Sequence, residues 1–313
     1  MKIVFMGTPQ FAVPSLRRLA LSRHTILAVV TNPDRPSGRG RTLSAPPVKL
    51  TALELGLPVL QPASLREASF AAELADIGAD LFVVVAFSIL PKPILRLAAA
   101  GAVNVHPSLL PAYRGAAPII WSIINGETAT GVTTFLLNPR VDAGDILMQR
   151  TVSIGPNETA GELDERLRKI GAELLVETVD GLEGGQLQPR AQGDTGATKA
   201  PKVSKQDGRI IWSRPATSVR NLIRGTNPIP GAFTEWAGGL LKVQAASLAP
   251  PGFSGEPGTV LSADSGAGLV VATGDDGALE LTEVQPAGKS PMAAGAFLRG
   301  YPVTVGSRFG FDE

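Results

Sequence analysis

The chain has 313 residues, 44% of them hydrophobic, which is enough to build the cores of two domains. Its 29 basic and 28 acidic residues nearly cancel, so a nucleic-acid partner would have to bind local basic patches. The absence of cysteine excludes disulfides, thiolate nucleophiles and cysteine zinc sites. The first apolar run is too short for a signal peptide and no run is long enough for a membrane span, so we expect a cytoplasmic protein with no membrane partner.

The first part of the chain alternates short apolar segments with helical ones. Segments rich in β-branched residues predict strands at residues 2–6, 25–30, 57–60, 80–87, 102–106 and 131–137. Near-continuous apolar strands that alternate with helices are typical of a parallel sheet covered on both faces. We therefore expect an α/β fold, in which residues 1–188 form a Rossmann-like domain with a mostly parallel sheet.

Two capping patterns mark the expected starts of helices. Ser64 and Glu67 have the S-x-x-E spacing, and the apolar pattern that follows them ends at Gly78. Thr159 and Glu162 repeat this spacing at the start of a longer helix that is expected to run to about residue 182.

The composition changes before the last third of the chain. Residues 189–206 have little periodicity and much Gly, Pro, Thr and Lys, which is typical of a linker. A short helix is expected from Ala216 to Arg224, with Gly225 as its stop. Closely spaced strand segments then follow at residues 231–236, 240–248, 258–263, 268–274 and 278–286. Short strands at this spacing predict a small β-barrel or sandwich in a second domain, residues 207–313.

A polar pair interrupts the apolar segment at residues 102–106. Because side chains alternate along a strand, Asn104 and His106 project from the same face, and Pro107 ends the strand. Ligands of open parallel sheets collect at the carboxyl ends of strands, which is where this pair would lie. The alternative is that both side chains cap the strand end and bond to neighbouring loops.

The VDAGD motif, whose aspartates are Asp142 and Asp145, follows the next strand and offers a carboxylate to the imidazole. A carboxylate bonded to one ring nitrogen fixes the tautomer and raises the basicity of the other. With Asn104 and His106, Asp142 fits the transfer of a carbonyl group to an amine. The Asn104 amide and the His106 imidazolium would stabilise the developing oxyanion, while Asp142 would hold His106 and help relay the amine proton. An ordinary turn is the alternative for this motif.

The chain resembles the methionyl-tRNA formyltransferase family in four motifs: IVFMGTPQFAVPSL, NPDRPSGRGR, NVHPSLLPAYRGAAP and VDAGD. The N-x-H, SLLP-x-x-RG and D-x-GD elements are shared more widely by folate-dependent formyltransferases. The resemblance covers nearly the whole chain and implies a Rossmann-like catalytic domain followed by an OB-like β-barrel. It also implies 10-formyltetrahydrofolate as the formyl donor and the amino group of methionyl initiator tRNA as the acceptor.

The same resemblance assigns site residues. It makes Asn104, His106 and Asp142 the catalytic set. The residues that it implies for the folate site are Ser108, Leu109, Leu110 and Pro111, together with Phe87 and Leu90. The last two belong to VVVAFSILPK, which is one residue shorter than the VVVAYGLILPK form common in the family.

Two segments concentrate positive charge. Between residues 31 and 49 four basic residues face Asp34 alone, and the Pro and Gly content predicts a long loop without regular structure. Residues 33–46 of this loop are expected to be mobile until tRNA binds. Around the linker and the following helix, eight basic residues face two acidic ones. This charge is the footprint expected for a phosphate backbone, although a merely solvated linker is the alternative. The residues expected to contact tRNA are Arg35, Arg39, Arg41, Lys202, Lys205, Arg209 and Arg220.

A metal site is not expected. His24 lies at a helix-to-strand junction, where a surface position is usual. The two histidines are far apart in the sequence, and the carboxylates that a metal site would need do not cluster convincingly.

Three functions remain open on the sequence. The leading one is formyl transfer to methionyl initiator tRNA in translation initiation, by a monomer with no DNA partner. The second keeps the chemistry but uses a small amine, such as an amino sugar nucleotide or glycinamide ribonucleotide, which would not require basic charge on distant segments. The third is a non-catalytic RNA-binding protein, and convergence of Asn104, His106 and Asp142 would argue against it.

Overall fold

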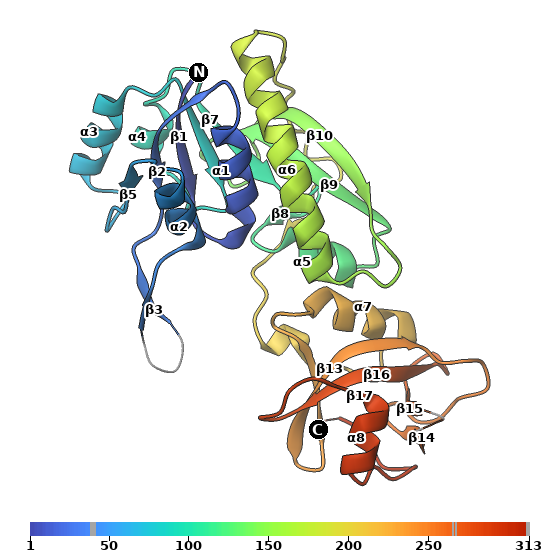
Figure 1. Cartoon of the computed structure of the whole chain (residues 1–313). Coiled ribbons are helices and arrows are strands. Elements are labelled where there is room, and N and C mark those ends of the chain that lie inside the picture. The colour runs from blue at the N-terminus through green and yellow to red at the C-terminus, as the bar shows by residue number, and fades with distance from the viewer. Residues whose placement is uncertain (38–41, 265, 267, 311–313) are drawn as a thin grey trace. The chain divides into compact units, whose positions relative to one another are not determined.

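The computed structural model describes residues 1–37, 42–264, 266 and 268–310 (Figure 1). The chain divides into two compact units. Residues 1–118, 129–153 and 164–200 form the first unit, and residues 119–128, 154–163 and 201–313 form the second. Among the described residues, no helix has the length and apolar character needed to cross a membrane.

A seven-stranded sheet forms the centre of the first unit. Its strands are β1 (Lys2–Gly7), β2 (Thr25–Val30), β5 (Val59–Leu60), β6 (Leu81–Val85), β7 (Ala102–His106), β9 (Ala129–Leu136) and β10 (Ile146–Ser153). They lie in the order β10-β9-β7-β6-β1-β2-β5. The pairs from β7 to β5 are parallel, whereas β9 runs antiparallel to β7 and to β10. The predicted, mostly parallel sheet is therefore confirmed.

Helices cover both faces of this sheet. They are α1 (Val13–Ala20), α2 (Pro47–Glu54), α3 (Ala68–Ile77), α4 (Lys92–Leu95) and α6 (Ala160–Glu183). Phe70 and Leu74 of α3 and Ile94 of α4 pack on one face, in a cluster that includes Ala102 of β7. On the other face α6 packs so closely on β7 that a Cβ on Gly171 would lie 3.0 Å from Val105 Cγ1. Because Ala102 and Val105 face opposite ways, the alternation of β7 turns its even-numbered side chains away from α6.

The two capping patterns have different outcomes. At the start of α6 the predicted capping pattern forms a capping box. Thr159 N donates to Glu162 Oε2 at 2.9 Å, and Glu162 N donates to Thr159 Oγ1 at 3.3 Å. The box predicted at Ser64 is wrong, because α3 begins further along the chain and Ser64 Oγ instead accepts the Arg66 N–H at 3.2 Å. Gly78 does end α3, with a left-handed φ of 63°.

The basic segment near residue 40 has more structure than expected. Strands β3 (Arg35–Ser37) and β4 (Thr42–Ser44) pair as an antiparallel hairpin, so the prediction of no regular structure is wrong for these residues. Pro36 lies within β3. A proline fits there because the outer edge of a two-stranded ribbon has no partner strand and needs no N–H donor. At the base of the hairpin, Asp34 accepts hydrogen bonds from Gln61 Nε2 at 2.8 Å and Lys49 Nζ at 2.7 Å, and both contacts hold its pKa below the usual value.

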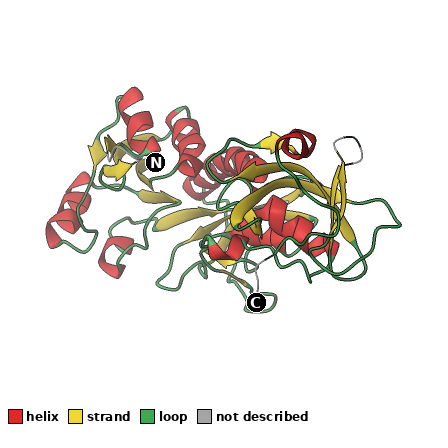
Figure 2. Cartoon of the chain, turned by 90° about the horizontal axis from the view of Figure 1, so that it is seen from below, coloured by secondary structure: helices red, strands yellow, loops and turns green. Residues whose placement is uncertain are grey.

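The second unit is built mainly from strands, with α7 and α8 packed against them (Figures 1 and 2). Its helices are α5 (Pro118–Ile124), α7 (Ala216–Thr226) and α8 (Ala294–Gly300). Its strands are β12 (Ala232–Trp236), β13 (Gly239–Leu248), β14 (Val260–Asp264), β15 (Gly268–Ala272), β16 (Ala278–Pro286) and β17 (Met292–Ala293). The order is β12-β13-β16-β15-β14, with β17 beside β16, and every pair is antiparallel. Closure into a barrel stays a prediction.

Helix α7 runs past its predicted stop. Gly225 lies inside the helix, which ends at Thr226, before Asn227 and Pro228. A side chain at Gly225 would crowd α5, because its Cβ would lie 2.8 Å from Ile124 Cγ1. This glycine therefore serves the packing of two helices and not the end of one.

Candidate active site

The polar pair of β7 lies where the strand ends in the first unit. His106 is buried, with 4% of its surface exposed, and Asn104 is partly exposed. Since Val105 faces α6, Asn104 and His106 project from the opposite face, as the alternation predicted. None of the hydrogen bonds found among the described residues uses the side-chain amide of Asn104. This amide is therefore available to a ligand.

The His106 ring lies between a carbonyl and a carboxylate. Its Nε2 lies 2.9 Å from the Tyr113 carbonyl oxygen, and its Nδ1 lies 3.8 Å from Asp142 Oδ2. Because a carbonyl only accepts, Nε2 carries the proton and Nδ1 presents its lone pair on the Asp142 side. Burial lowers the pKa of His106, and the Asp142 charge and the Tyr113 carbonyl oppose this only in part. The resting imidazole is therefore neutral at neutral pH.

A tight turn between β9 and β10 presents Asp142. Its backbone has a left-handed φ of 49°, and its Oδ2 accepts the Gly115 N–H at 2.9 Å. Any side chain on Gly144 would overlap the Leu136 carbonyl oxygen, so this turn requires glycine. Asp145 is exposed. The structure thus brings Asp142, and not the second aspartate of the motif, to His106.

The turn that follows His106 is held by its own polar groups. Ser108 is fully buried, and its Oγ donates to the Ala112 carbonyl at 2.6 Å. Leu110 packs against Phe135 in a small core, and its N–H donates to Thr133 Oγ1 at 3.1 Å. Of the four residues expected to line a folate site in this turn, Leu109 and Pro111 keep exposed surface.

The loop after β6 divides its apolar residues between core and surface. Leu90 is 6% exposed and lies in the core cluster with Ile94, while Phe87 packs on the edge of that cluster. Ile89, which was not expected to take part in the site, is 77% exposed.

The predicted tRNA contacts differ in accessibility. Arg35, Lys202 and Lys205 are exposed, whereas Arg209 and Arg220 are partly buried. Arg39 and Arg41 lie outside the residues that the structure describes.

Arg224, one of the eight basic residues around the linker and the following helix, has a structural role. Within the second unit, Arg224 is 9% exposed and its guanidinium donates to the Gly155 and Glu158 carbonyls, both at 3.2 Å. Its charge is therefore not available to a phosphate.

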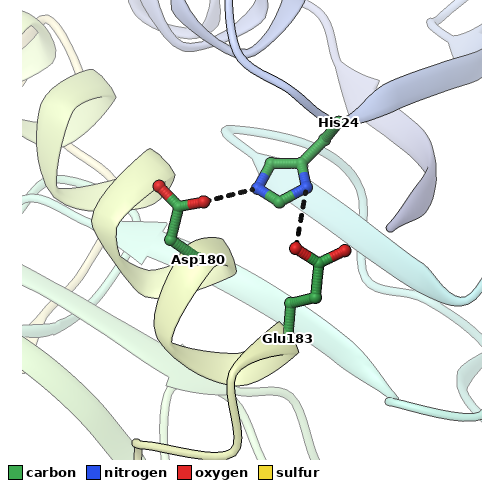
Figure 3. A group of neighbouring side chains, drawn as sticks. All are labelled: His24, Asp180 and Glu183. Atoms are coloured by element: carbon green, nitrogen blue, oxygen red, sulfur yellow. Dashed lines mark ion pairs between the residues drawn. The ribbon is translucent and has the colours of Figure 1, made fainter.

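His24 belongs to an ion-pair cluster in the first unit (Figure 3). Its side chain is fully buried, with Nε2 3.3 Å from Asp180 Oδ1 and Nδ1 4.0 Å from Glu183 Oε2. The predictions of a surface histidine and of no clustered carboxylates are therefore wrong, because both acids come from α6, far along the chain. Such a group has the composition of a metal site. Arg23 already pairs with both acids, at 2.7 and 2.9 Å, so a cation would compete with a guanidinium.

Comparison with known proteins identifies related families and chains. The family model described as Formyl transferase matches residues 1–179, and the model described as Formyl transferase, C-terminal domain, matches residues 202–302. The methionyl-tRNA formyltransferase of Moorella thermoacetica is 47% identical over 311 residues, which cover 99% of each chain. That of Desulfotalea psychrophila is 47% identical over 301 residues, which cover 96% of this chain and 93% of the relative.

A solved structure shares the fold. The N-formyltransferase from Helicobacter canadensis, in complex with folinic acid and dTDP-3-aminofucose, has a TM-score of 0.67 and covers 91% of this chain and 99% of its own. At 17% identity, that likeness concerns the fold alone. The two family models and the near full-length relatives show that the chain belongs to the methionyl-tRNA formyltransferase family.

Proposed function

We propose that the chain transfers a formyl group from 10-formyltetrahydrofolate to the free amino group of methionyl initiator tRNA. The observation that carries this proposal is the position of His106, held at the end of β7 between the Tyr113 carbonyl and the Asp142 carboxylate. The names of the near full-length relatives support the same activity.

The reaction forms a bond between the acceptor nitrogen and the formyl carbon and breaks the bond from that carbon to N10 of the folate. The amine must lose a proton, and N10 must gain one. His106 is neutral at rest, so it can take the amine proton at Nδ1, and the Asp142 carboxylate stabilises the imidazolium that forms. The Asn104 amide donates to the formyl oxygen as negative charge develops there. The imidazolium can return the proton to N10.

The carboxyl ends of β6 and β7 offer apolar surface that fits a folate ring system. Ile89 is exposed after β6, and Leu109 and Pro111 are partly exposed after β7. These residues would hold the donor by apolar contact while the polar pair of β7 faces its formyl group. The folinic acid bound by the Helicobacter canadensis enzyme supports a donor of the folate class.

Exposed basic side chains support a tRNA acceptor. Lys202 and Lys205 are exposed where the chain enters the second unit, and Arg35 is exposed on the hairpin of the first. Charge on separate segments suits an extended phosphate backbone better than a small amine. The cytoplasmic location, the monomeric state and the absence of a DNA partner stay predictions.

The deciding experiment supplies purified protein with 10-formyltetrahydrofolate and one acceptor at a time. The acceptors are methionyl initiator tRNA, methionyl elongator tRNA and a dTDP-linked amino sugar. We expect formyl methionine on the initiator tRNA alone. Formylation of the amino sugar without formylation of tRNA would replace this proposal by the small-amine function.

A further inference from the structure

The segment expected to be a linker lies against the active site of the first unit. Strand β11 (Lys199–Ala200) pairs with β8 (Arg114–Gly115), and Tyr113 N donates to Thr198 Oγ1 at 2.8 Å. Residues 188–199 are all described, and within them Gln192 is the one residue that is not exposed. Its side chain is therefore directed inward while its neighbours remain in contact with solvent.

The Gln192 amide joins the two segments that hold the catalytic pair. Its Nε2 donates to the carbonyls of Asp142 at 3.1 Å and Gly144 at 2.6 Å. Its Oε1 accepts from Arg114, at 3.2 Å from Nε and 2.9 Å from the terminal nitrogen. Arg114 lies between Tyr113, which binds His106, and Gly115, which binds Asp142. The Gln192 amide thus donates to the turn that carries Asp142 and accepts from Arg114, the neighbour of the residue that binds His106.

We infer that Gln192 is a positioning residue for the formyl transfer, holding the Asp142 carboxylate at its working distance from His106. The left-handed backbone of Asp142 needs support from its surroundings, and two carbonyls directed at one NH₂ group supply it. Without these donors the turn can relax and carry the carboxylate away from the Gly115 N–H and the imidazole. The inference rests on the proposed function, because it assigns Gln192 to the same reaction.

Two variants separate the donor side of the amide from its acceptor side. Gln192→Met keeps the approximate size of the side chain but removes both the hydrogen-bond donors and the acceptor of the amide. Gln192→Glu keeps an acceptor for Arg114 but sets oxygen against the two carbonyls. If the donors position Asp142, both variants lower kcat by about tenfold to a hundredfold, the scale of a small misplacement of a catalytic group. The KM values for folate and tRNA should stay within about twofold, since misplacement of the carboxylate acts on the reacting state.

The matched controls are Gln188→Met and Gln188→Glu, which place the same changes on an exposed glutamine four positions earlier in the chain. They should behave like the unaltered protein. Three results would overturn the inference: normal kcat in Gln192→Met, normal kcat in Gln192→Glu, or a raised KM with unchanged kcat.

A second readout does not depend on activity. The chain has two histidines, so imidazole NMR follows His106 directly once a His24→Gln variant has assigned the signals. Among the described residues, Asp142 is the charged group within ion-pair distance of His106, and its charge raises the His106 pKa. Gln192→Met should therefore lower the titration midpoint of His106. An unchanged midpoint refutes the positioning role, while a lowered midpoint in a protein that does not formylate tRNA refutes the proposed function alone.

Discussion

At the scale of single residues, the two nitrogens of His106 have different partners. The Tyr113 carbonyl accepts the Nε2 proton, which leaves Nδ1 as the basic nitrogen on the side of Asp142. Burial keeps the ring neutral until it takes a proton, and the carboxylate stabilises the charge that then appears. The same carboxylate is fixed by the Gly115 N–H, so it remains in place through the reaction.

The role of Asp142 can be tested by making the same substitution at each aspartate of the VDAGD motif and comparing the two variants. Asp142→Asn keeps an oxygen that can accept the Gly115 N–H but loses the charge beside His106, so kcat should fall by about 100-fold. Asp145→Asn makes the same change at an exposed position and should leave kcat within about twofold. Steady-state formylation of methionyl initiator tRNA measures both. Equal losses in the two variants would remove the assigned role of Asp142.

At the scale of elements, the starts of helices show how sequence patterns depend on context. Thr159 and Glu162 form reciprocal bonds at the start of α6. Ser64 has the same spacing to Glu67 but closes a local turn before α3 begins. Serine side chains bond to nearby N–H groups in turns as well as at helix starts, so the pattern alone does not distinguish these outcomes.

This difference should appear in stability. Thr159→Ala removes a bond to the helix start and should lower the free energy of unfolding by about 1 kcal/mol. Ser64→Ala removes only an exposed turn contact and should cost less than about 0.5 kcal/mol. Urea unfolding followed by circular dichroism gives both values, with the unaltered protein as reference. A cost for Ser64→Ala equal to that for Thr159→Ala would contradict the observed helix start.

The sequence predicts a strand best where its apolar pattern is clear. Strands β2 and β7 match their predicted limits because β-branched, apolar runs mark them, and β16 does so because buried Leu279 and Leu281 alternate with polar residues. Strand β10 was missed because it is an edge strand in which polar residues interrupt the apolar pattern after Met148. The paired strands β8 and β11 have two residues each, too few for any periodicity.

The residues of the candidate site also differ in whether the sequence could predict them. Asn104, His106 and Asp142 could be selected because their residue types carry chemistry. Gln192 could not, because its partners lie 48 and 50 positions away and neither its type nor its spacing signals a role. The burial of His24 was missed for the same reason, since its acidic partners belong to α6.

At the scale of the whole molecule, a net charge of +1 conceals large local differences. In the second unit Lys202 and Lys205 are exposed, while the Arg224 guanidinium donates to backbone carbonyls. The buried histidines, His24 and His106, both belong to the first unit. Acid and salt should therefore affect different properties of the protein.

Acid should destabilise the first unit. Burial lowers the pKa of both histidines, so the unfolded chain binds more protons than the folded one. Their contribution to stability is present above about pH 6.5 and is lost as the pH falls through the lowered pKa values. Thermal unfolding at pH 7.5 and 5.5 should show a lower Tm in acid. The His24→Gln, His106→Gln double variant should show a smaller decrease, and an unchanged decrease would refute the assignment.

Salt should weaken tRNA binding through the exposed lysines. Replacing Lys202 and Lys205 by glutamine should flatten the plot of log affinity against log salt by about 0.7 to 0.9 for each phosphate that is no longer neutralised. Lys289→Gln removes an exposed charge of the second unit outside the basic segment and is the control. Filter binding across a salt series measures the slopes. If the double lysine variant keeps the slope of the control, these lysines do not bind phosphate.

The pairing of β11 with β8 also has a consequence for the order in which the protein is made. The ribosome synthesises the strands of the parallel sheet well before it reaches Gln192 and Ala200. Until those residues emerge, Tyr113 N lacks its Thr198 partner and the Asp142 turn lacks its amide. A nascent chain arrested before residue 190 can therefore hold a folded sheet with an unfinished site. Full catalytic activity should therefore begin only when the last segment of the first unit leaves the exit tunnel.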